Sequence, residues 1–146
     1  MHDWTLEVAM VQSFRELQVW QKAMDLADAV YTVTAAFPRH EIFGLTSQLR
    51  RAAVSIPSNI AEGRAIGGGR FLHHLRIAIG SEAELETQME LAVRRSYISS
   101  GHAQEILATA TEVRRMLHAM HHTLKTRRIA GLTMLLMLGY AATLWA

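Results

Sequence analysis

The sequence predicts an all-α protein in which residues 14–128 form an antiparallel up-down-up-down four-helix bundle. Apolar residues recur three and four positions apart along four runs of similar length, which is the spacing of one helix face. The breaks between the runs are short, so consecutive helices are expected to be antiparallel neighbours. Half of the 146 residues are apolar and only two are proline, a composition that favours helices in a single domain.

The first two helices are separated by a proline. The first apolar run covers Phe14–Phe37, and Pro38 ends it because proline cannot continue a helix. The second run covers Glu41–Ile66. Pro57 lies inside the second run, where it removes a backbone hydrogen bond. We therefore expect this helix to be bent or divided.

The last two helices are bounded by glycine and serine. Gly67–Gly69 predicts a turn, because three glycines carry a large entropy cost inside a helix. The third helix is expected from about Arg70 to Tyr97, where the segment Ser99–Gly101 follows. The fourth is expected from about His102 onward. The four predicted helices thus have the similar lengths that a bundle requires.

The two ends of the chain differ from the bundle, and we treat residues 1–13 as an N-terminal extension and residues 129–146 as an apolar tail. The extension lacks the pattern of a signal peptide, so a cytoplasmic location is expected. The tail has no charged residue and follows a basic cluster, and its length reaches the lower limit of a membrane span. Three interpretations remain open: a membrane anchor, a further helix packed on the bundle or another subunit, and an extension without a role. Any membrane contact is expected only through residues 129–146.

The chain offers little of the chemistry that enzymes use. It has no cysteine, which excludes disulfides, thiolate zinc sites and cysteine nucleophiles. Serine, histidine and aspartate do not occur at a recognisable nucleophile spacing. The Glu-x-x-His pattern of di-iron bundles is absent, and His118 and His122 lack a nearby carboxylate that would complete a metal site. We therefore expect no enzymatic activity, no catalytic residue, no cofactor and no metal.

Polar residues form a stripe along one side of the second predicted helix, at spacings of four, four and three. They are Arg51, Ser55, Asn59 and Glu62. Buried polar groups are costly unless they are paired, so we expect them to pair with Ser81 and Glu84 of the third helix. Such a network would set the register of the two helices. The alternative is that the stripe binds a ligand or a partner.

Basic residues are concentrated toward the C-terminus, although the formal charge of the whole chain is only +2. Residues 96–128 carry five basic and two acidic groups. The candidate contacts to nucleic acid are Arg94, Arg95, Arg114, Arg115, Lys125, Arg127 and Arg128. If the chain forms an oligomer, the phosphate contacts of its subunits would add up to strong salt-dependent binding. The alternative is that these residues pair with nearby glutamates and only keep the surface soluble.

Four segments carry a family resemblance, which covers about residues 13–127. They are Phe14–Met24, Leu45–Arg51, Ser55–Gly63 and Leu75–Met89. The chain resembles the four-helix-bundle proteins encoded in intervening sequences of bacterial 23S rRNA genes, which are related to the accessory variability determinant of diversity-generating retroelements. The resemblance implies a ring of five bundles. Through that related protein it also implies contact with nucleic acid and a reverse transcriptase. The three glycines and the apolar tail depart from the family pattern.

Two functions are compatible with the sequence. The first is a non-enzymatic homo-oligomer, expected to be a pentamer, that binds RNA, DNA or a nucleic-acid-processing partner such as a reverse-transcriptase-like protein through its basic surface. The second is a structural scaffold or protein-interaction module without nucleic-acid affinity, which the tail could tether to a membrane.

Overall fold

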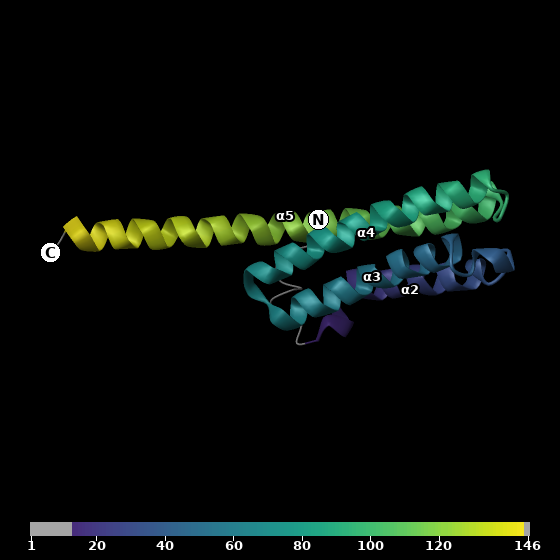
Figure 1. Ribbon diagram of the computed structural model, residues 1–146. Helices are drawn as coiled ribbons and strands as arrows, with labels where there is room; N and C mark the ends of the chain where they lie inside the picture. Colours follow the sequence, from purple (N-terminus) through teal and green to yellow (C-terminus); the bar gives the residue numbers. More distant parts are fainter. Residues whose placement is uncertain (1–12, 145–146) are drawn as a thin grey trace.

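The structure is a computed structural model that describes the backbone of residues 13–144 and the side chains of residues 13–134 (Figure 1). This part of the chain contains two short 3₁₀ helices and four α-helices. They are η1 (Phe14–Glu16), α2 (Gln18–Thr34), η2 (Arg39–Glu41), α3 (Leu45–Ile66), α4 (Gly68–Arg94) and α5 (Ser100–Leu144). The predicted four-helix bundle is confirmed.

The four helices pack in a closed order, because α2 contacts α3, α3 contacts α4, α4 contacts α5, and α5 contacts α2. The connections alternate between the two ends of the bundle, and α5 continues well past the other helices (Figure 1). Each helix contributes apolar residues at three-and-four spacing to one core. The largest fully buried apolar side chains are Leu17, Val19, Leu26, Leu49, Ile56, Ile60, Leu75, Leu85, Met89, Leu117 and Met120. Each contributes about 1.5–3 kcal/mol of burial free energy.

The first two helices are shorter than the sequence predicts. Leu17 is extended, with φ −69° and ψ 121°, and it separates η1 from α2. The α2 helix ends at Thr34 rather than Phe37, although Phe37 remains buried. The α3 helix begins at Leu45 rather than Glu41, because the Glu41 carboxylate accepts a hydrogen bond from the Leu45 amide at 2.8 Å and so caps the helix from outside.

Pro57 does not divide α3, which is one continuous helix. The proline lies among the fully buried side chains of Ala53, Ile56 and Ile60, and it is itself buried. A proline inside a helix costs about 3 kcal/mol. Burial of Pro57 and of its apolar neighbours offsets that cost. Of the two outcomes expected from the sequence, a bend or a division, the division was wrong.

The turn between α3 and α4 consists of Gly67 alone, so the expected three-glycine turn and the start at Arg70 were wrong. Gly67 and Gly68 have φ angles of 73° and 58°, in the region that favours glycine. Gly69 has no positive φ, and nothing therefore excludes it from the helix.

The turn between α4 and α5 is closed by backbone and side-chain hydrogen bonds. Ser96 has a positive φ angle of 59°. Its amide donates a hydrogen bond to the Val93 carbonyl, and the Tyr97 amide donates one to the Ala92 carbonyl, both at 2.9 Å. This pattern ends α4 at Arg94 instead of Tyr97. The Ser99 hydroxyl accepts a hydrogen bond from the His102 amide at 3.3 Å. This cap starts α5 at Ser100, two residues before the predicted start.

The apolar tail is not a separate element, because residues 129–144 continue α5 without a break. Ile129, Leu132 and Met134 are exposed. Among the described residues, no helix combines the length and the apolar character needed to cross a membrane. The membrane-anchor interpretation depends mostly on the side chains of residues 135–146, which lie outside the described part, as do residues 1–12 of the N-terminal extension.

Two glycines in helix interiors should respond oppositely to alanine. A methyl group on buried Gly63 would lie 2.7 Å from the His74 Cβ and 2.8 Å from the Phe71 ring, whereas one on Gly80 would meet nothing within 4 Å. We expect Gly63→Ala to lower the free energy of unfolding by about 1–3 kcal/mol and Gly80→Ala to raise it by up to about 1 kcal/mol. Chemical denaturation of both variants measures the two effects. Equal effects would contradict the close approach of α3 and α4 at Gly63.

Candidate functional site

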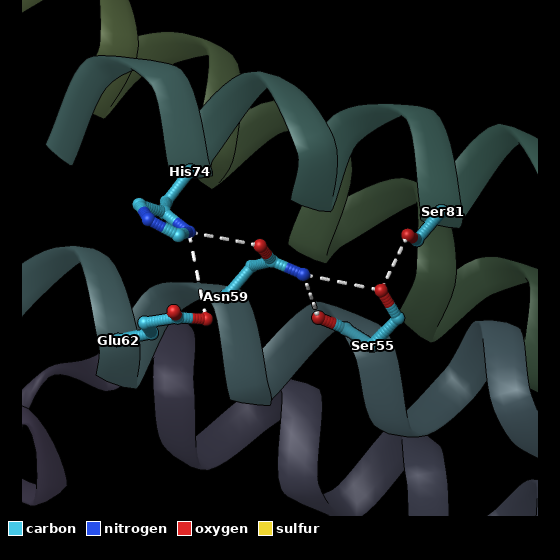
Figure 2. Close-up of polar contacts among 5 residues, drawn as sticks. All are labelled: Ser55, Asn59, Glu62, His74 and Ser81. Carbon is cyan, nitrogen blue, oxygen red and sulfur yellow. Dashed lines mark hydrogen bonds and ion pairs between the residues drawn. The ribbon is translucent and has the colours of Figure 1, made fainter. Parts of the chain in front are cut away.

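Polar side chains join α3 to α4 along the middle of their interface (Figure 2). The hydroxyls of Ser55 and Ser81 are 2.8 Å apart. The Asn59 amide donates to the Ser55 carbonyl at 2.8 Å and lies 3.1 Å from the Ser55 hydroxyl. These contacts bring together three of the six residues that the sequence assigned to this network, and Glu62 joins them through His74.

His74 extends this network, and the sequence did not assign it. Its Nδ1 lies 3.0 Å from the Asn59 side-chain oxygen and 3.8 Å from a Glu62 carboxylate oxygen (Figure 2). His74 and Ser81 are seven residues apart, two turns of α4, so they share the face that meets α3. This seven-residue spacing is the sequence feature from which His74 could have been assigned to the network. His73, its neighbour in sequence, lies on another face and lines the groove between α4 and α5.

Arg51 and Glu84 lie outside the network. Both are exposed, and they line a shallow concavity together with Ser55. Among the described residues, no ion pair joins the two side chains. The paired part of the predicted stripe therefore runs from Ser55 to Glu62.

Glu82 is a fully buried carboxyl group on α4. Neither of its oxygens has a hydrogen-bond partner among the described residues. Burial, and then the neighbouring Glu86 carboxylate, raise the pKa of Glu82 to about 7. Glu86 forms an ion pair with Arg114 of α5 at 2.8 Å, and Arg114 acts in the opposite direction on the pKa of Glu82. Burial therefore favours the protonated, neutral form of this carboxyl.

The seven candidate nucleic-acid contacts do not form one surface. Arg94 and Arg95 lie at the end of α4, whereas Lys125 and Arg128 lie beside its beginning. The 27 residues of α4 span about 40 Å, which separates the two groups. Arg114 forms an ion pair with Glu86, so it is less available for a phosphate contact than the sequence suggested. Arg115, Lys125, Arg127 and Arg128 are exposed.

A groove of about 700 Å³ lies between the first turns of α4 and the middle of α5. We call it the basic groove, and its polar lining is His73, Arg76, His121, Lys125 and Arg128. The Arg128 guanidinium lies against Gly69, where a methyl group would come within 2.7 Å of it. Among the described residues, no ion pair involves any of these side chains.

The charge of the basic groove is not balanced locally. No acidic residue occurs between positions 63 and 81 or after Glu112, so neither wall contains a carboxylate near the groove. Burial, followed by the nearby Lys125 and Arg76 and by His118 and His122, lowers the pKa of His121. Such mutual repulsion favours the binding of an anion. Sequence reasoning missed Arg76 because its position opposite Lys125 depends on how α4 packs against α5.

A second concavity, of about 430 Å³, lies on the outer face of α2 and α3. Its lining is mostly apolar and includes Phe14, Trp20 and Pro57. Met24, Tyr31 and Val54 on this face are 41–45% exposed. We call it the α2–α3 apolar face. Apolar surface of this kind commonly marks a protein–protein contact.

Comparison with known proteins gives a family and a related fold. The model of the family described as 23S rRNA-intervening sequence protein matches residues 15–119, which is more than half of the chain. A crystal structure from Bacteroides thetaiotaomicron, described as a protein of unknown function from the S23 ribosomal protein family, is similar with a TM-score of 0.67 and 25% sequence identity. The similarity covers 72% of this chain and 96% of that one. The comparison with curated proteins finds no match.

Glu82 should make the stability of the bundle depend on pH. Its pKa is higher in the folded protein than the ordinary value of 4.5, so the folded state retains a proton that the unfolded state has lost. Stability should therefore fall as pH rises from about 4.5 to about 7. Glu82→Gln stays neutral, and we expect its Tm to exceed that of the wild type by about 5 °C at pH 8. At pH 5 the two Tm values should be close.

The exposed Glu84→Gln is the matched control for this measurement, and its Tm difference from the wild type should not change with pH. Thermal unfolding followed by circular dichroism at pH 5 and pH 8 makes the comparison. A Glu82→Gln difference that is the same at both pH values would contradict the buried, raised pKa of Glu82.

Proposed function

The chain belongs to the 23S rRNA-intervening sequence protein family, and we propose that it is a non-enzymatic homo-oligomer that binds nucleic acid through the basic groove. The observation that carries the proposal is a groove lined by arginine, lysine and histidine, with no acidic residue among its lining residues. In the groove, positive charge is concentrated on a concave surface. We propose a cytoplasmic location for this activity.

The net charge of +2 understates the local charge at this end of the bundle. Residues 63–81 contain three arginines, and residues 113–146 contain five basic residues, without one acidic residue in either segment. The acidic residues are carried by other parts of the chain. A phosphate backbone that approaches the groove meets the charges of Arg76, Lys125 and Arg128, which form no ion pair among the described residues. Positive charge of this kind is the electrostatic requirement for binding.

Self-assembly would multiply these contacts. The α2–α3 apolar face lies on two helices that do not line the basic groove, so copies can associate through it and leave the groove open. We propose five copies, the number that the family resemblance implies. At about two phosphate contacts per subunit, such a ring makes about ten, which gives strong and salt-dependent binding.

Binding across a salt series tests this function on the full chain. We expect affinity for RNA or DNA to fall steeply with salt, on a sample whose light-scattering mass corresponds to an oligomer. Lys125→Ala/Arg127→Ala/Arg128→Ala should lower affinity at least tenfold and flatten the salt dependence. Tyr31→Glu/Val54→Glu should lower the assembly mass and, with it, the affinity.

Arg94→Ala/Arg95→Ala is the matched control, since it removes two arginines from the opposite end of α4 and should leave most of the affinity. An oligomer that binds neither RNA nor DNA at low salt would contradict the proposal. That result would favour a scaffold, or a surface that docks a nucleic-acid-processing protein such as a reverse-transcriptase-like partner.

A further inference from the structure

The lining of the basic groove is not purely cationic. On α4 its residues lie three and four positions apart, so Leu72 and Arg76 share one wall. On α5 the same spacing places Ile129 and Leu132 beside Lys125. Both walls therefore combine positive charge with apolar surface. A ligand that used the whole groove would need an anionic part and a flat or apolar part.

The two histidines add ring surface to this groove. His73 is exposed on α4, and His121 is half-buried on α5. Imidazole rings and guanidinium planes are surfaces on which unpaired nucleobases stack. Burial and the neighbouring cations lower the pKa of His121, which favours the neutral form of its ring. A neutral ring can stack on a base without repelling Lys125 and Arg76.

We propose that the basic groove holds one unpaired nucleotide, with its phosphate at Arg76, Lys125 and Arg128 and its base against the histidine rings and the apolar walls. The consequence is a preference for single-stranded over double-stranded nucleic acid. The inference rests on the proposed function and adds to it the class of nucleic acid that is recognised.

Duplex nucleic acid would use only half of this groove. Its bases are stacked inside the helix, so it presents phosphates and sugars to a protein surface. It could meet the arginines and the lysine, but it would leave Leu72, Ile129 and Leu132 without contacts. A single strand can turn one base outward into the groove, and a groove of about 700 Å³ has room for it.

Fluorescence anisotropy with two probes tests the proposal on the full chain. The probes are a labelled 12-nucleotide single-stranded RNA of mixed sequence without self-complementarity and the same strand annealed to its complement. We expect the single strand to bind at least about tenfold more tightly at equal salt. Arg76→Ala/Lys125→Ala should weaken both probes and flatten both salt dependences, because it removes phosphate contacts.

Two variants separate the base contacts from the phosphate contacts. His73→Ala and the exposed Leu132→Ser should each lower single-strand affinity about fivefold. Both should leave duplex affinity within about twofold. Circular dichroism of each variant confirms that the bundle is folded.

The outcomes distinguish this inference from the function on which it rests. Equal affinity for the two probes, or equal losses for both in His73→Ala and Leu132→Ser, would overturn the unpaired-nucleotide site and leave nucleic-acid binding intact. Absence of binding to either probe at low salt would overturn both.

Discussion

The close packing of α3 against α4 is the constraint on which the rest of the structure depends. A one-residue turn at Gly67 joins the helices, and the missing side chain of Gly63 lets α3 approach Phe71 and His74. The Ser55–Ser81 and Asn59–His74 contacts then fix how far one helix slides along the other and how α4 is rotated. Arg76 follows His74 by two residues, about 200° around the helix. Once His74 faces α3, Arg76 faces away from it and lines the basic groove with α5.

Polar groups inside the bundle act in two different ways. In the α3–α4 network each buried group has a partner, so the network costs little and disfavours other alignments of the two helices. Glu82 is also buried, but its carboxyl oxygens have no partner among the described residues, and its raised pKa reflects that cost. The first arrangement favours one register of the two helices. From the raised pKa of Glu82, we expect the second to lower the stability of the bundle as pH rises.

Much of the fold was predictable from the sequence, because the spacing of apolar residues directly reports which face each helix buries. The helix ends were less predictable, since they depend on contacts such as the Glu41 cap on Leu45 and the left-handed Ser96. The network was predicted in part: Ser55, Asn59 and Ser81 were assigned from helical spacings. His74 was missed, although it lies two turns from Ser81 on the same face of α4. The basic groove could be identified only from the structure. Arg76 and Lys125 are far apart in sequence, and only the packing of α4 on α5 brings them to the same groove.

The central claim is that nucleic acid binds at the basic groove, and the two lysines of the chain allow a direct test. Lys125 lines the groove. Lys22 of α2 does not line it, and its Nζ lies 2.6 Å from a carboxylate oxygen of Glu112, with which it forms an ion pair. Lysine acetylation of the full chain, with and without single-stranded RNA, can be quantified at each lysine by mass spectrometry. We expect RNA to slow the acetylation of Lys125 and to leave that of Lys22 unchanged. Equal protection of both lysines, or protection of Lys22 alone, would contradict it.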